Sequence, residues 1–131
     1  MPATTAEDRT LAMLSHTGAI LSVVLSLGGL GWVVPLFMWL LNRERRPFVA
    51  FHALQALLFN LLWMAIFGIT AMVVLALCLL IIGLALLPLV FIVWLIPLIW
   101  SAVAAIKASA GEWYLFPGVG KFALAHTVVQ R

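Results

Sequence analysis

The sequence predicts an all-α integral membrane protein: a helical bundle of four segments, three long and one short, with its N- and C-termini in the cytoplasm. Three observations predict this class. Hydrophobic residues make up 66% of the 131 residues and charged residues only 8%, against about 25% charged residues in an ordinary soluble domain. Residues 48–106 contain no Lys, Arg, Asp or Glu. Three arginines gather in one short loop that separates the apolar stretches.

The charge-free run of residues 48–106 is long enough to fold back on itself. As one helix it would extend roughly 90 Å, about three times the thickness of a hydrocarbon core. Gly83 and Pro88 interrupt its pattern, and both residue types favour a turn. We therefore expect two long helices, at residues 48–82 and 84–109, joined by a tight turn between residues 79 and 88.

The first apolar stretch, residues 11–42, is harder to divide. It would measure roughly 48 Å as a helix, which is too long for one straight span and too short for two. Glycines at positions 28, 29 and 31 interrupt it, and Pro35 follows. The preferred interpretation is a helix over residues 11–27, a glycine turn, and a short returning helix over residues 32–41. One long kinked helix is the alternative.

This division gives a single membrane domain with a short segment at each end. Residues 1–10 are polar and form an N-terminal tail, in which Asp8 or Thr10 could cap the first helix. Residues 11–110 form the transmembrane helical domain. Residues 111–131 form an interfacial C-terminal segment, because Pro117 and neighbouring glycines end the last span. One cysteine, Cys78, can make no internal disulfide.

Orientation follows from the basic loop that contains Arg43, Arg45 and Arg46. Short loops rich in Arg and Lys stay in the cytoplasm. If the glycine turn is extracytoplasmic, both termini and the C-terminal cations fall on the cytoplasmic side. One long kinked helix would instead place the N-terminus on the opposite side of the membrane. We read this cluster as a topology signal and not as a nucleic-acid surface. The predicted location is the plasma or inner membrane.

Small residues recur at helical spacing along the first helix, and Ser15, Ala19, Ser22 and Ser26 lie on one of its faces. Such a face lets a second helix approach closely in lipid, where close packing drives association. We expect it to pack within the subunit or between copies. The predicted partners are the lipid bilayer and a homo-oligomer or larger membrane complex.

Four polar side chains stand out in the apolar segments: His16, His52, Gln55 and Asn60. A Gln amide that faced lipid would remain unsatisfied, at a cost of a few kcal/mol. His52 and Gln55 share a helix face with Asn60 at its margin, and His16 enters the membrane from the same side. The sequence therefore predicts a polar clamp between the two helices.

Two other uses of these residues stay open. His16 and His52, with His126 as a third ligand, could hold a haem or a transition metal, although no carboxylate or thiolate joins them. His52, Gln55 and Asn60 could line the path of an oligomeric transporter or channel. No cofactor or metal site is predicted, and no enzyme, because the sequence has no nucleophile motif, carboxylate pair or phosphate loop.

Several of these positions also resemble a known family. They are His16 with Gly18, Pro35 with Trp39, the block Phe51-His52-Ala53-Leu54-Gln55-Ala56 continuing to Asn60, and residues 105–112 ending at Pro117. They resemble a prokaryotic family of small membrane proteins of unknown function, which is similar to the twenty-kilodalton Tic protein of the chloroplast inner-envelope import machinery. The resemblance covers about residues 10–120. Thr17 and Ala19 flank Gly18 where that family commonly has a second glycine.

The resemblance implies a four-helix membrane fold with a role in protein translocation or membrane-complex assembly. Together with the residue patterns, it predicts a small multi-pass protein of unknown biochemical activity. We expect a scaffold, assembly or translocation-type component that acts through helix–helix contacts. The transporter or channel subunit and the haem- or metal-binding protein are the alternatives.

Overall fold

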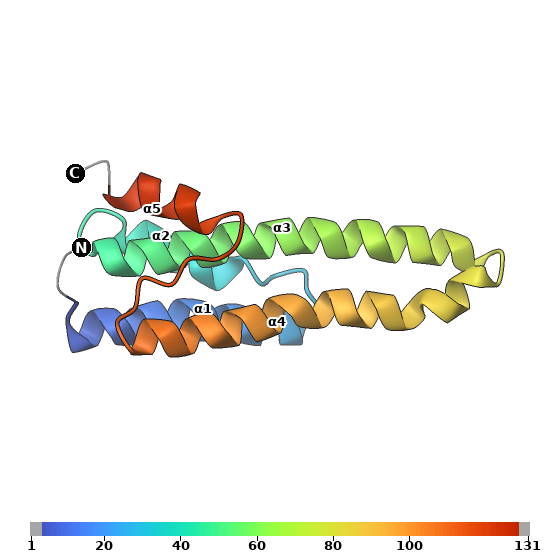
Figure 1. Cartoon of the computed structure of the whole chain (residues 1–131), viewed down its shortest axis with the longest axis horizontal. Helices are drawn as coiled ribbons and strands as arrows, with labels where there is room; N and C mark the ends of the chain where they lie inside the picture. The colour runs from blue at the N-terminus through green and yellow to red at the C-terminus, as the bar shows by residue number, and fades with distance from the viewer. Residues whose placement is uncertain (1–3, 129–131) are drawn as a thin grey trace.

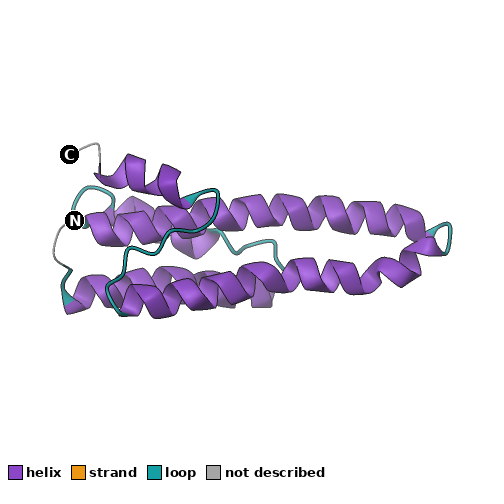
Figure 2. Cartoon of the chain, in the orientation of Figure 1, coloured by secondary structure: helices purple, strands orange, loops and turns teal. Residues whose placement is uncertain are grey.

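The computed structural model describes residues 4–128, and every regular element within them is helical (Figures 1 and 2). The elements follow in the order α1 (Ala6–Ser26), α2 (Val33–Asn42), α3 (Pro47–Cys78), the 3₁₀ turn η1 (Ile82–Leu86), α4 (Leu87–Ser109) and α5 (Gly120–Val128). The predicted helical bundle is confirmed. Residues 11–42 form two segments and not one kinked helix. Residues 1–3 of the predicted N-terminal tail and residues 129–131 of the predicted C-terminal segment lie outside the described residues.

The first helix begins earlier than the sequence predicts. Thr5 is its N-cap: Asp8 N–H donates to Thr5 Oγ1 at 3.1 Å, and Thr5 N–H donates to Asp8 Oδ2 at 3.0 Å. This reciprocal pair satisfies two backbone donors at the helix start. The prediction of Asp8 or Thr10 as the cap was therefore wrong, because the carboxylate of Asp8 acts from the third helical position.

The turn after α1 reverses the chain with two residues of positive φ. Leu27 caps the helix in the left-handed conformation, with φ 53°, and Gly28 follows with φ 105°. Glycine adopts that second conformation without steric cost. The chain then returns through α2 alongside the helices of the bundle (Figure 1).

The α3–α4 hairpin is longer than the α1–α2 hairpin and extends well past it (Figure 1). α3 ends at Cys78, four residues before the predicted end, and α4 starts at Leu87 and not at residue 84. The intervening residues form the turn, in which Ile81 is left-handed with φ 66° and η1 leads into α4. Pro88 lies in the first turn of α4, where its missing N–H costs little.

Small side chains bring α1 and α4 together. Ala12, Ser15 and Ala19 of α1 are buried, as are Ser101, Ala104, Ala105 and Ala108 of α4, and Ala12 packs with Ala108 in one core cluster. Ser22 and Ser26, which share the predicted face, are partly buried. The hydroxyls of Ser15, Ser22 and Ser26 each donate to the carbonyl four residues earlier. In the described structure this face therefore packs within the subunit.

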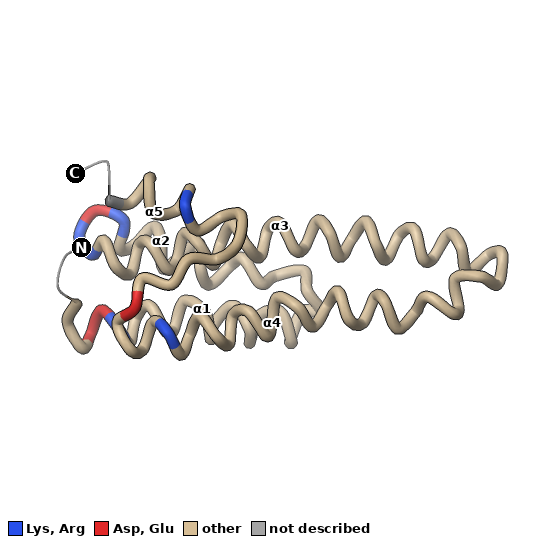
Figure 3. The backbone as a smooth tube through the Cα atoms, in the orientation of Figure 1, with Lys and Arg blue, Asp and Glu red and all other residues tan. Residues whose placement is uncertain are grey.

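All the Lys, Arg, Asp and Glu residues within the described part of the chain lie toward one end of the bundle, and the start of α1 and the end of α5 lie there too (Figures 1 and 3). Three helical stretches are long and apolar enough to cross a membrane: Ala6–Ser26, Pro47–Cys78 and Ile82–Ser109. Val33–Asn42 is a shorter apolar helix. We call the charge-bearing end the charged end.

Candidate functional site

A buried polar cluster lies in the half of the bundle nearest the charged end. α1 contributes His16, and α3 contributes His52 and Gln55 one helical turn apart; all three residues are 0% exposed. Apolar rings surround them: Phe48 lies edge-on to His52 with ring centroids 4.6 Å apart, and Phe116 lies 5.4 Å from His16. The cluster is therefore enclosed by protein and does not face lipid.

The two histidines bond to each other. His16 Nε2 lies 3.1 Å from His52 Nδ1, and His52 Nε2 lies 2.9 Å from the carbonyl oxygen of Glu112. A carbonyl oxygen only accepts, so His52 Nε2 must carry the proton. In neutral rings His52 Nδ1 then accepts from the Nε2–H of His16. These bonds fix both tautomers and leave His16 Nδ1 as a buried acceptor with no donor among residues 4–128.

Gln55 binds the loop between α4 and α5 with both ends of its amide. Its Nε2 donates to the carbonyl of Tyr114 at 2.8 Å, and its Oε1 accepts from the N–H of Phe116 at 2.8 Å. The side chain thus pairs with the loop backbone much as a neighbouring strand would. With His52 on Glu112, it fastens residues 112–116 to α3.

Asn60 does not join this network. Its Nδ2 donates to the carbonyl of Ala56 on its own helix at 2.8 Å. Its Oδ1 faces Gly31 at the end of the α1–α2 turn, where an added Cβ would lie 2.7 Å away. Asn60 therefore lies beside the α1–α2 turn, deeper in the bundle than Gln55, and the structure separates it from the other three predicted residues.

Ion pairs join α1 to the residue before α3 at the charged end, beyond this cluster. Arg46, just before α3, donates from Nη2 to Glu7 Oε1 at 2.7 Å and from Nη1 to Asp8 Oδ1 at 3.2 Å. The pKa of the Arg46 guanidinium is raised, first by its hydrogen bond to Glu7 and then by the charges of Glu7 and Asp8. Arg46 therefore ties the first turn of α1 to the start of α3. Arg43 and Arg45 are exposed, and Arg43 Nε lies 3.9 Å from Glu44 Oε1.

Replacing Arg46 by glutamine should loosen the start of α1 without unfolding the bundle. Exposed ion pairs contribute little and are screened by salt. We expect a small loss of thermal stability at low salt that shrinks at high salt, measured on the purified protein in detergent. Arg45→Gln, one residue away and in no described ion pair, is the matched control. Equal losses for the two variants at every salt concentration would contradict this role of Arg46.

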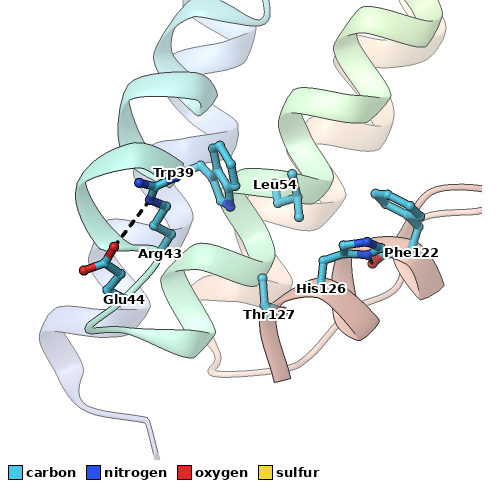
Figure 4. Close-up of a pocket in the computed structure, with 7 residues that line it drawn as sticks. All are labelled: Trp39, Arg43, Glu44, Leu54, Phe122, His126 and Thr127. Atoms are coloured by element: carbon cyan, nitrogen blue, oxygen red, sulfur yellow. Dashed lines mark hydrogen bonds and ion pairs between the residues drawn. The ribbon is translucent and has the colours of Figure 1, made fainter. Parts of the chain in front are cut away.

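A groove opens at the charged end between α2, α3 and α5 (Figure 4). Its volume is about 630 Å³, and its lining residues are Trp39, Arg43, Glu44, Leu54, Phe122, His126 and Thr127. The guanidinium of Arg43 lies 5.6 Å from the centre of the Trp39 ring. His126 stacks on Phe122 with ring centroids 3.9 Å apart, and its Nδ1 donates to the Phe122 carbonyl at 2.9 Å. Among the predicted site residues, His126 and Arg43 thus belong to this groove.

The geometry of the histidine pair is that of hydrogen-bonding partners. Two imidazole nitrogens on opposite faces of a haem iron would stand about 4 Å apart, because each lies about 2 Å from the metal; here the distance is 3.1 Å. The ring centroids are 5.3 Å apart, which leaves no room for a haem between the rings. No group of three metal-ligating side chains occurs among the described residues. The haem or metal alternative thus gains no support, and neither does a path lined by His52 and Gln55, whose side chains bond to the protein's own backbone.

The main partner in the cluster was not predicted from the sequence. Residues 112–116 were expected to form an interfacial loop, yet their carbonyl and amide groups satisfy His52 and Gln55, and Phe116 is 2% exposed. Backbone groups carry no sequence signal. The available hint was Phe116 itself, a large apolar side chain just before the helix-breaking Pro117.

Comparison with known proteins gives one match. Residues 7–123 match the model of the MamF/MmsF family, described as the magnetosome magnetite crystal formation protein family. No curated protein and no solved structure matches the chain. The match agrees with the predicted prokaryotic membrane family and gives no support to the predicted similarity to the Tic protein. Because the match covers most of the chain, this protein belongs to the MamF/MmsF family of magnetosome magnetite crystal formation proteins.

Proposed function

We propose that this chain is a non-enzymatic scaffold of the magnetosome membrane that promotes magnetite crystal formation through contacts with other membrane components. The match to the MamF/MmsF family over residues 7–123 carries this proposal. The magnetosome membrane therefore replaces the plasma or inner membrane as the proposed location. A translocation role has no support from the comparisons and is not part of the proposal.

The polar cluster supports a scaffold over a catalyst. Apart from one His16 nitrogen, the ring nitrogens and the Gln55 amide are used in bonds between α1, α3 and the 112–116 loop. Their effect is to hold the loop and α5 against α3. The same contacts fix the shape of the charged end, where Glu44, Arg45 and Lys121 are exposed. We propose this end as the surface that meets partners outside the lipid.

Contacts within the membrane are part of the same proposal. Most of the α3–α4 hairpin presents large apolar side chains outward, Ile69, Met72 and Leu75 among them. Lipid covers such a surface as well as another helix would. A homo-oligomer or a larger complex is therefore part of the proposal. Site-specific photocrosslinkers at Arg45 and at Leu75 would distinguish partners at the charged end from partners in the membrane.

Gene replacement in a magnetosome-forming bacterium tests the proposed function. The resident family member is deleted and this chain is supplied as wild type, as Gln55→Leu or as Leu62→Ala. We expect smaller or fewer magnetite crystals in the deletion strain by electron microscopy, restored by wild type and by Leu62→Ala but poorly by Gln55→Leu. Leu62 is exposed on the same helix and makes no polar contact in the described structure, so it is the matched control. Crystals that do not differ between the deletion and complemented strains would overturn the proposal.

A further inference from the structure

The position of Lys121 indicates where the membrane begins on α3. Lys121 is exposed in the first turn of α5. Its neighbour Gly120 packs so closely on α3 that an added Cβ would lie 2.6 Å from Gln55 Oε1. Lys121 is therefore level with Gln55. Because an ammonium group stays at the headgroups, the near edge of the hydrocarbon lies within about one helical turn of Gln55.

The far edge of the hydrocarbon coincides with the tip of the α3–α4 hairpin. From Gln55 to Cys78, α3 rises about 35 Å, which fits a core of about 30 Å at a tilt of about 30°. The turn beyond Cys78 is apolar throughout, and Leu79 and Ile81 are 87% and 75% exposed. Immersing the charged end further would push this apolar turn into water, which the hydrophobic effect opposes.

The α1–α2 turn stops well short of that far edge. An added Cβ on Gly28 would lie 3.6 Å from Trp94 Cδ1 and 3.7 Å from Phe67 Cδ1, so the turn is level with Phe67. Phe67 lies about 18 Å along α3 from Gln55, close to the middle of the bilayer, and about 16 Å before the end of α3 at Cys78. Although α1 is long and apolar enough to cross, its depth against α3 places its end inside the membrane.

The backbone of this turn is built for an apolar surrounding. Irregular backbone within the hydrocarbon must satisfy its polar groups inside the protein. Gly28 N–H donates to the Val23 carbonyl at 2.9 Å, and Leu30 N–H donates to Ser26 Oγ at 2.8 Å. The Trp32 ring N–H donates to the Gly29 carbonyl at 3.0 Å. Together these bonds satisfy two N–H groups and one carbonyl group of the turn within the protein.

We propose that α1–α2 is a re-entrant hairpin that turns inside the bilayer, and that the protein is a wedge that favours membranes convex on the charged side. The leaflet at the charged end holds parts of α1, α2, α3 and α4, whereas the other leaflet holds, of residues 4–128, the α3–α4 hairpin alone. Two extra segments of about 10 Å diameter add about 160 Å² to the near leaflet. This inference rests on depth and shape and is independent of the proposed role in crystal formation.

Cysteine labelling tests the re-entrant hairpin. In a Cys78→Ala background, a single cysteine replaces either Gly29 or Arg45. Gly29 is exposed, and an added Cβ there would meet only Ser26 O, at 3.7 Å, so the substitution fits. We expect a membrane-impermeant maleimide to label Arg45→Cys from the charged side, and to label Gly29→Cys only after the membrane is dissolved. Labelling of Gly29→Cys in intact vesicles, from either side, would overturn the hairpin.

Sorting between membranes of different curvature tests the wedge. The Arg45→Cys protein carries a dye in giant phosphatidylcholine–phosphatidylglycerol vesicles from which a narrow tube is pulled. An impermeant quencher separates the molecules whose charged end faces outward from those facing inward. Because a wedge has a direction, we expect outward-facing molecules to be enriched about twofold or more in the tube and inward-facing ones depleted. Equal partition of both orientations, or enrichment of both, would overturn the wedge.

Discussion

Replacing Gln55 by leucine is expected to lower the free energy of unfolding by about 2–4 kcal/mol. Leucine fills a similar volume but leaves the Tyr114 carbonyl and the buried N–H of Phe116 without the partners that they have at 2.8 Å. Each unsatisfied buried group costs about 1–3 kcal/mol. Titration of the purified protein from mild detergent into SDS, followed by tryptophan fluorescence, measures the loss.

The same substitution should release the end of the chain before the bundle unfolds. Gln55 fastens residues 114–116 to α3, and α5 follows directly, so trypsin should cut after Lys121 faster in the variant. Leu62→Ala, on the exposed side of α3, should match wild type in both the titration and the cleavage rate. If Gln55→Leu were as stable and as protease-resistant as wild type, the clamp would not be holding α5.

Hydrophobicity, the length of the apolar run and its turn residues were together sufficient to predict the α3–α4 hairpin. The absence of charge in residues 48–106 and the length of that run required a hairpin, and Gly83 and Pro88 placed its turn in the correct region. The ends of the helices could not be predicted as well. Residues 79–86 are as apolar as the helices on either side, so no change in composition marks the end of α3 at Cys78.

Periodicity predicted the direction of the polar side chains but not the loop groups that His52 and Gln55 bind. A spacing of three residues places His52 and Gln55 on one face of α3, and both are buried in the structure. The groups that they bind belong mostly to the backbone of residues 112–116, about sixty positions away. Asn60 differs from these two residues, because its amide donates to the carbonyl of Ala56 one turn earlier on the same helix. A helical Asn can make this local bond at any position.

Replacing Gly83 by alanine is expected to cost about 3 kcal/mol, the upper end of the usual range for overpacking. Gly83 is buried where η1 folds back on the end of α3, and an added Cβ would collide with the Cys78 nitrogen, the Val74 carbonyl oxygen and the Leu77 carbonyl carbon. All three are backbone atoms, so no side-chain rotation relieves the clash. The tip of the hairpin must therefore open to admit the methyl group.

Gly68→Ala is the matched control, because Gly68 lies within α3 and an added Cβ there would meet nothing within 4 Å. Alanine is the better helix former by about 1 kcal/mol, so this variant should be as stable as wild type or slightly more stable. The two glycine substitutions should therefore shift the SDS unfolding midpoint in opposite directions or, at the least, shift it for Gly83→Ala alone. If Gly83→Ala and Gly68→Ala unfold at the same SDS concentration, then residues 79–86 do not pack back on α3. The conformation described for the hairpin tip, which defines the far edge of the wedge, would then be wrong.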